Sequence, residues 1–334
     1  MNPADLSRSV VRALRCAVED GELAVEVPER VVVERTRPGG VGEYATAVAF
    51  RVAKGAGIKP ADVAGVLARR LAAEAGIRDV EITGAGFLNF TLQGSGSAAL
   101  VARVLASDLL PYGFAENAYR PDVPADQPRE PRRRAVTGAV LRIAASQGIA
   151  ASQGVTGDGA RPGAGVPVTP VAPVARRDGD VEGRYGADAA RWAMLAVGPA
   201  ETPVFTDRLL VQDESSELFR VRYAHSRALA LTRNAARLGY AADVGPVDAP
   251  ALLAALADYP IALEAAAHHR EPDRLLRQLV VVADALLDFH YTVLPVGDEK
   301  PGAAHRARLA LAEAAGTVLA GGLALLGIDA PELI

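Results

Sequence analysis

Residues 217–238 have the clearest capacity for chemistry, because they combine a buried-helix pattern with a concentration of arginine. Apolar residues recur there at steps of three and four, which predicts a helix with one buried face. Five arginines lie outside this apolar stripe, at Arg220, Arg222, Arg227, Arg233 and Arg237. Arg222, Arg233 and Arg237 should share one flank of the helix. The segment therefore predicts a docking strip for an anionic partner, with an ordinary solvated surface as the alternative.

Two further side chains of this helix could contact a nucleotide. Tyr223 could stack on a base, although packing in the core would use the same ring equally well. His225 lies within the apolar stripe, so a buried histidine with satisfied hydrogen bonds is favoured over a nucleotide contact.

Other chemistries lack the residues that they need. Histidine first occurs at position 225, no cluster of His, Asp and Glu has metal-ligand spacing, and Gly-x-Ser-x-Gly is absent. The single cysteine, Cys16, excludes an internal disulfide and a thiolate metal site. The sequence predicts neither a metal nor a cofactor.

Length and composition predict a soluble protein of two or three domains, because the chain has 334 residues and half of them are apolar. The net charge of -4 argues against a uniformly basic surface. Residues 1–115 carry 13 basic and 13 acidic groups, whereas residues 241–334 carry 6 and 13, so any nucleic-acid contact should be confined to patches. Charges interrupt the apolar runs and the N-terminal segment, which indicates a cytoplasmic protein without a membrane span or signal peptide.

The first 112 residues read as a small α+β domain. Apolar periodicity, β-branched runs and glycine turns predict its elements. We expect helices over 4–20, 43–55, 59–75 and 98–109, and strands over 31–35, 80–83 and 87–92.

The middle of the chain changes in composition. Residues 117–183 are rich in proline and glycine and contain a near-duplicate Ala-Ser-Gln-Gly, so they read as linker-like sequence with one helical island over 135–147. The basic run Arg132-Arg133-Arg134 is either a solvated linker or a phosphate contact. From residue 212 onward the pattern is helical, with Pro260 among the residues expected to separate helices.

Several segments resemble arginyl-tRNA synthetases. Tyr223-Ala224-His225-Ser226-Arg227 is similar to the start of their anticodon-binding domain, and Leu323-Ala324-Leu325-Leu326-Gly327-Ile328 to its end. Gly42-Glu43-Tyr44-Ala45-Thr46 and Gly86-Phe87-Leu88-Asn89-Phe90 are similar to motifs of their N-terminal domain, and Gly186 to Trp192 to the closing segment of their catalytic domain. The resemblance covers about 1–112 and 184–334.

The resemblance implies tRNA contacts in both flanking parts. In the N-terminal domain it points to Gln93 at the end of the last strand, together with Arg35, near the tRNA elbow. In the helical domain it points to Arg222, Tyr223, His225, Arg227, Arg233 and Arg237 near the anticodon. The chain departs from the pattern after Phe289-His290, where part of the helix end that shapes the anticodon pocket is missing.

The family's catalytic signatures do not occur in this sequence. Pro128-Arg129-Glu130-Pro131 stands where the resemblance would place His-x-Gly-His, and no lysine lies between Lys59 and Lys300 to form a Lys-Met-Ser-Lys-type loop. Those motifs stabilise charge during adenylate formation. We therefore expect that the chain is not an enzyme, whereas a family label alone would describe an ATP-binding arginine–tRNA ligase.

Together these observations predict an α+β N-terminal domain and an all-α anticodon-binding bundle of the DALR type. The expected parts are the N-terminal domain at 1–112, a vestigial, linker-like middle at 113–183, a catalytic-domain remnant at 184–205 and the helical domain at 206–334. We expect an accessory or regulatory protein that binds tRNA without catalysing a reaction. The alternative is a protein-interaction module that docks on a synthetase or a biosynthetic enzyme, which the acidic 241–334 segment favours.

Overall fold

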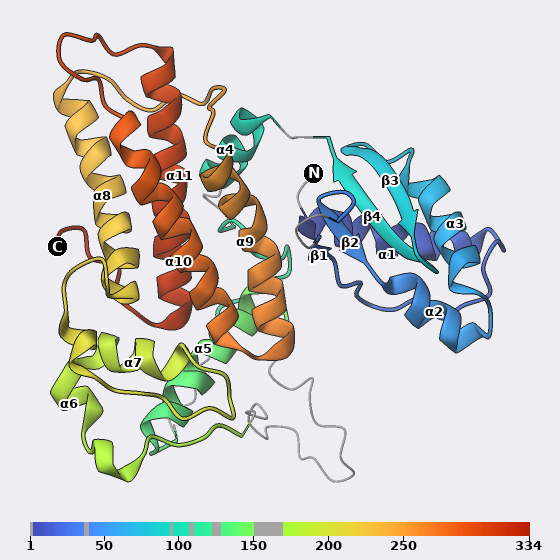
Figure 1. Ribbon diagram of the computed structural model, residues 1–334, viewed down its shortest axis with the longest axis horizontal. Helices are drawn as coiled ribbons and strands as arrows, with labels where there is room; N and C mark the ends of the chain where they lie inside the picture. The colour runs from blue at the N-terminus through green and yellow to red at the C-terminus, as the bar shows by residue number, and fades with distance from the viewer. Residues whose placement is uncertain (1–2, 37–39, 94–95, 107–109, 122–127, 150–169) are drawn as a thin grey trace. The chain divides into compact units, whose positions relative to one another are not determined.

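The computed structural model describes residues 3–36, 40–93, 96–106, 110–121, 128–149 and 170–334 (Figure 1). The chain divides into two compact units, residues 1–96 and 97–334, each with its own internal contacts. Unit 1 is the α+β part and unit 2 is helical, so the predicted fold class is confirmed.

Unit 1 is built around an antiparallel sheet with the strand order β1-β2-β4-β3. Its elements are α1 (Pro3–Glu19), β1 (Glu34–Arg35), β2 (Tyr44–Thr46), α2 (Val48–Ala56), α3 (Pro60–Leu71), β3 (Ile77–Thr83) and β4 (Phe87–Leu92). Leu6, Val10 and Leu14 of α1 are fully buried, as are Leu67 of α3 and Phe90 of β4. These side chains give the sheet and helices a common core.

The prediction of a helix over 43–55 is wrong in its first half. Tyr44–Thr46 forms β2 and pairs with β4, with Tyr44 opposite Phe90. Gly42 permits this approach, because it has a φ of 72° and a Cβ atom there would lie 2.8 Å from the Phe90 carbonyl oxygen. The helix begins only at Val48.

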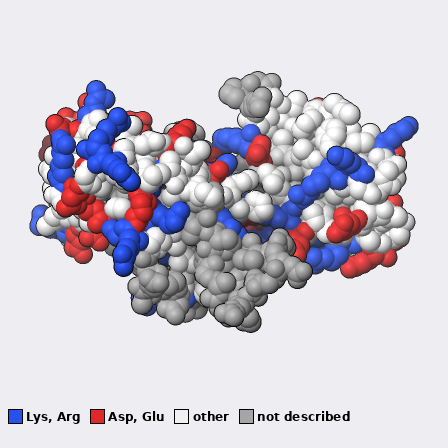
Figure 2. Space-filling model, turned by 90° about the horizontal axis from the view of Figure 1, so that it is seen from below, with Lys and Arg blue, Asp and Glu red and all other residues white. Residues whose placement is uncertain are grey.

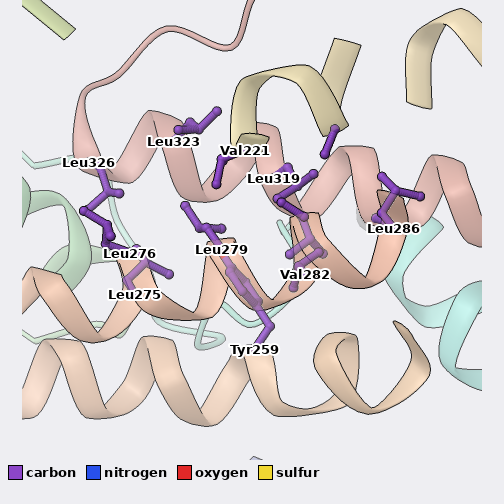
Figure 3. Close-up of a cluster of buried hydrophobic side chains, with 14 of the residues drawn as sticks. Val221, Tyr259, Leu275, Leu276, Leu279, Val282, Leu286, Leu319, Leu323 and Leu326 are labelled. Carbon is purple, nitrogen blue, oxygen red and sulfur yellow. The ribbon is translucent and has the colours of Figure 1, made fainter. Parts of the chain in front are cut away.

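Unit 2 is a helical assembly. Its helices are α4 (Ser97–Leu105), α5 (Pro131–Ser146), α6 (Val181–Tyr185), α7 (Ala187–Leu195), α8 (Glu217–Arg237), α9 (Pro250–His269), α10 (Pro272–Phe289) and α11 (Ala303–Leu326). Short 3₁₀ turns lie at Arg176–Asp178, Asp207–Leu210 and His290–Thr292. Helix α11 packs against α8, α10, α4 and α5. Side chains of α8, α9, α10 and α11 meet in one apolar cluster (Figure 3).

Two segments have different partners from those that the sequence suggested. We expected the helix over 98–109 to close the N-terminal domain, whereas α4 packs on α11 and α9 of unit 2. We expected a linker-like middle with one helical island over 135–147, and α5 lies at that island. Its Ala139 and Ile143 are fully buried in the core of unit 2, which the sequence did not indicate.

Helix α9 runs through Pro260, which we had expected to end a helix. A proline inside a helix leaves the carbonyl four residues earlier without its N–H donor. Here that carbonyl belongs to Leu256, and it accepts a hydrogen bond from the hydroxyl of Tyr112 at 3.2 Å. A tertiary hydrogen bond therefore replaces the helical one.

Helices α9 and α11 are long and apolar enough to cross a membrane by length and composition alone, which we did not expect from the sequence. In α11, 72% of the most apolar window is buried inside the protein, and in α9 44%. The core position of α11 accounts for its apolar character without a membrane.

Candidate nucleic-acid interface

Helix α8 is fixed by its apolar stripe. Ser216 caps its first turn, because its hydroxyl accepts a hydrogen bond from the Phe219 N–H at 3.4 Å. Val221 and Ala228 are buried against the core. Gly316 of α11 lies so close to α8 that a Cβ atom added to it would be 2.9 Å from the Ala228 Cβ atom. The buried stripe of α8 therefore faces α11, and a flank of α8 lies on each side of that stripe.

One flank of α8 faces α10 and the 3₁₀ turn that follows it. Arg220 forms an ion pair with Asp284 of α10 at 3.0 Å. The Nε atom of Arg227 is buried and has no hydrogen-bond partner among the described residues. Burial lowers the pKa of the nearby His290, and the charge of Arg227 lowers it further. A hydrogen bond to the Leu287 carbonyl opposes both effects by raising that pKa.

The other flank of α8 faces the C-terminal segment, residues 328–334. Arg222 forms an ion pair with Asp188 of α7 at 2.9 Å and donates to the carbonyl of Asp329 at 3.1 Å. Arg233 donates to the carbonyl of Glu332 at 3.4 Å. Arg237 is exposed and contacts Asn234 of its own helix at 3.4 Å. Part of the predicted docking strip therefore binds the chain itself.

The five arginines of α8 thus fall into two groups. Arg220 and Arg222 are paired with carboxylates. Arg227, Arg233 and Arg237 have no carboxylate within ion-pair distance in the described part of the chain. Only this second group keeps a positive charge that an external anion could neutralise.

His225 is a core histidine. Its side chain is 6% exposed, and its Nδ1 atom lies 3.1 Å from the carbonyl oxygen of Pro331. Burial lowers the pKa of His225, opposed by the Pro331 carbonyl and by Glu332. This burial fits the core interpretation and does not fit a direct nucleotide contact by the ring.

Tyr223 keeps a surface that a base could use. It is 37% exposed and stacks on Phe219, with the ring centroids 5.6 Å apart and the planes 9° apart. A parallel aromatic pair at the surface offers an apolar face for stacking. Base stacking by Tyr223 stays a prediction.

The two residues predicted in unit 1 lie at the surface. Arg35 ends β1, with its guanidinium 5.6 Å from the centre of the Tyr44 ring. Gln93 follows β4 and is exposed, and its N–H donates to the Gly76 carbonyl at 2.9 Å. The next two residues, Gly94 and Ser95, lie outside the described residues. A tRNA contact here stays a prediction.

Arg132 is neither a solvated linker residue nor an exposed phosphate contact, so both sequence interpretations of this residue are corrected. Its side chain is fully buried. The guanidinium donates to five backbone carbonyls, those of Ala172, Met194, Val197, Gly198 and Glu201. Glu130 caps α5 through the N–H groups of Arg132 and Arg133. The basic run is therefore mainly a structural element, and of its three arginines Arg133 is the exposed one.

A pocket of about 660 Å³ lies where α7, the start of α8 and the C-terminal segment meet. Asp188 and Arg222 form its polar wall, and Phe219 and Leu210 are among its apolar residues. Sequence reasoning missed Asp188 as the partner of Arg222, because 34 residues separate them. The surface charge is otherwise mixed, with basic side chains among acidic ones on the visible faces of both units (Figure 2).

Family comparisons match both units. The arginyl tRNA synthetase N-terminal domain matches residues 4–92, and the DALR anticodon-binding domain matches residues 221–334. The chain is related to the arginyl-tRNA synthetases. The two matched regions contain all eight residues that we predicted to contact tRNA except Gln93, which follows the first region directly.

One sequence relative agrees with this assignment, and one solved structure agrees in fold. An arginine–tRNA ligase of Frankia alni is 49% identical over 115 residues, which is 34% of this chain and 21% of the ligase. The matched region thus spans about a fifth of that relative. The arginyl-tRNA synthetase of Thermus thermophilus has the same fold, with a TM-score of 0.63 at 16% identity over 100% of both chains. A putative arginyl-tRNA synthetase from Campylobacter jejuni reaches a TM-score of 0.40 at 21% identity, over 46% of this chain and 35% of that one.

The expectation that the chain is not an enzyme is contradicted by these findings. The Frankia relative is named as a ligase, and the fold is that of an arginyl-tRNA synthetase. No comparison indicates an inactive chain. Missing signatures in the linear sequence are therefore not a sufficient basis for excluding catalysis.

Proposed function

We propose that the chain binds tRNA, and that α8 supplies part of the contact. The observation that supports this most directly is the presence of both the synthetase N-terminal domain and the anticodon-binding domain in one chain. Helix α8 lies almost wholly within the second domain. The arginines of α8 without a carboxylate partner are positively charged, and a phosphate backbone binds positive charge.

The proposed contact uses Arg233 and Arg237 on one flank and Arg227 on the other. Arg237 is exposed, and Arg233 makes only a long hydrogen bond to a carbonyl, so both can reach a phosphate. Tyr223 lies on the same helix with part of its ring open to solvent. Phosphate contacts position the RNA, and a stacked base would add selectivity.

The test is tRNA affinity measured by fluorescence anisotropy at several salt concentrations. The wild-type affinity should fall steeply with salt, because phosphate binding releases counterions. Each of Arg233→Gln and Arg237→Gln should weaken binding and lower the logarithmic salt slope by about 1. A salt-independent affinity for the wild-type chain would refute the proposal.

A matched control carries the same charge change at another place. Arg184 of α6 is exposed and paired with Asp207 at 3.0 Å, so Arg184→Gln should leave the salt slope nearly unchanged. Equal losses in Arg184→Gln and Arg237→Gln would show that only net charge matters, and would refute a contact by α8. An accessory role, cytoplasmic localisation and the alternative of a protein-interaction module stay predictions.

A further inference from the structure

A second group of arginines surrounds a small pocket that shares no residue with α8. The pocket has a volume of about 190 Å³ and lies within unit 2. Arg134, Gly138 and Arg142 line it from one face of α5, and Arg191 lines it from α7. Glu182 of α6 and Gly327 after α11 complete the lining, together with Ala135. Three guanidinium groups and one carboxylate therefore share this space.

The positive charges of this pocket are only partly compensated. Glu182 neutralises Arg134, with oxygen distances of 2.9 and 3.0 Å. Arg191 donates to the Gly327 carbonyl, and its nearest carboxylate, Asp188, lies 3.7 Å away and is bound to Arg222 at 2.9 Å. Arg142 has no carboxylate partner among the described residues. Arg191 thus shares its only nearby carboxylate among the described residues with Arg222, and the charge of Arg142 has no carboxylate beside it.

Arg142 is held in place with its outer donors unused. Its Nε atom donates to the Leu325 carbonyl at 2.8 Å, which fixes the plane of the guanidinium. The Nη1 and Nη2 atoms make no hydrogen bond within the described part of the chain. A side chain that is oriented before binding loses less freedom when a ligand arrives.

Two glycines leave room for this arrangement. A Cβ atom at Gly327 would lie 2.5 Å from Nη2 of Arg142, and one at Gly138 would lie 3.3 Å from Nη1. Glycine in the middle of a helix costs about 1 kcal/mol relative to alanine, yet α5 has one at the pocket wall. Burial and the charge of Arg191 both lower the pKa of Arg142, which an anion in the pocket would counteract.

We propose that this pocket binds a phosphate group between Arg142 and Arg191. Guanidinium donors match phosphate oxygens in forked geometry, and a phosphate offers more acceptors and more charge than a carboxylate. The volume is below the roughly 300–1,000 Å³ of typical ligand pockets, so it suits the phosphate itself rather than a nucleotide base. The phosphate belongs either to a small phosphate ester or to an RNA backbone.

The first experiment titrates the full chain with inorganic phosphate at constant ionic strength, with chloride as the balancing ion. Binding should be saturable in calorimetry, and the Nε–Hε NMR signals of Arg142 and Arg191 should shift. Arg142→Gln should weaken binding by at least about tenfold, because it removes one charged fork. Arg133→Gln removes an equal charge from the exposed face of the same helix and should bind phosphate like the wild type.

A second variant covers the case in which Arg142→Gln does not fold. Gly138→Ala keeps every charge but crowds Nη1 of Arg142, so phosphate binding should weaken while the helix persists. Two results would overturn the proposal. One is a wild-type calorimetric response to phosphate that is no greater than the response to chloride. The other is an equal loss of phosphate affinity in Arg133→Gln and Arg142→Gln.

A tRNA arm distinguishes the two sources of the phosphate. Parallel losses of phosphate and tRNA affinity in Arg142→Gln would support an RNA backbone phosphate at this pocket. A loss of phosphate affinity with tRNA affinity unchanged would support a small phosphate ester. The pocket can fail this test while α8 still binds tRNA, because the two sets of variants do not overlap.

Discussion

Helices α5 and α8 both contain several arginines and both bury a basic side chain against the core of unit 2. In α5 that side chain is Arg132, which stays charged and is surrounded by five backbone carbonyls. In α8 it is His225, which can lose its charge and needs only the Pro331 carbonyl beside it. An arginine cannot be deprotonated in practice, so its burial requires a full shell of acceptors. A histidine can avoid the same cost by releasing a proton.

The difference shows that a basic residue in a sequence is not by itself evidence for an external anion. Arg132 connects α5 to carbonyls between residues 172 and 201, so it joins segments that surround α6 and α7. Arg222 of α8 likewise joins α7 and the C-terminal segment. The arginines available to a ligand are those left after such internal pairing. Three predictions test how α5 and α8 are each held against the core.

The largest effect is expected for Arg132→Met, which should destabilise unit 2 by about 3–5 kcal/mol. The substitution leaves several buried carbonyls without donors, and each unsatisfied polar group costs about 1–3 kcal/mol. Urea unfolding followed by far-UV circular dichroism measures the loss. Arg133→Met on the exposed side of α5 should change the free energy of unfolding by no more than about 0.5 kcal/mol. Equal stability of the two variants would show that the carbonyl shell does not hold α5 in place.

An intermediate effect is expected where α8 meets α11. Gly316→Ala should destabilise unit 2 by about 1–2 kcal/mol, because the new methyl group meets the Ala228 Cβ atom at 2.9 Å. Overpacking costs about 1–3 kcal/mol, and the higher helix propensity of alanine returns up to about 1 kcal/mol. Urea unfolding again gives the change in free energy.

Gly321→Ala in the same helix is the matched control. No atom lies within 4 Å of a Cβ atom at Gly321, so only the gain in helix propensity remains. The variant should be more stable than the wild type by about 0.5–1 kcal/mol. Changes of the same sign at the two positions would mean that close packing of α8 on α11 does not fix the helix.

Local patterns were sufficient for the elements with clear periodicity. The apolar stripe of α8, the amphipathic α1 and the β3–β4 pair with its glycine turn were all predicted at nearly their observed positions. The strand β2 was missed, because three residues carry no readable period and β4 alone makes them a strand. The prediction that Pro260 ends a helix was wrong, because the Tyr112 hydroxyl that bonds the free carbonyl of α9 lies far away in the sequence.

The candidate sites divide in the same way. The arginines of α8 could be found from the sequence, but their pairing with Asp188, Asp284 and the C-terminal carbonyls could not. Arg134, Gly138 and Arg142 stand at steps of four, so their shared helix face was readable. That this face meets Arg191 depends on the packing of α5 against α7. Tertiary contacts therefore decide which basic residues are free.

The smallest effect concerns pH and separates His225 from Arg132 by their chemistry. The pKa of His225 in the folded chain is lowered by burial, whereas an unfolded histidine titrates near 6.5. Below that pH the unfolded chain binds more protons, so the free energy of unfolding falls as pH drops from about 6.5 towards the folded pKa. His225→Gln should reduce this fall, because glutamine does not titrate. Urea unfolding at about pH 7.5 and pH 5.5 gives both slopes.

Arg132→Met provides the control for this pH dependence. It should keep the wild-type pH dependence despite its larger overall loss, because the arginine stays protonated throughout this range. If His225→Gln and the wild type show the same pH dependence, then His225 does not release a proton on burial as its surroundings indicate. The contrast between α8 and α5 would then depend on Arg132 alone.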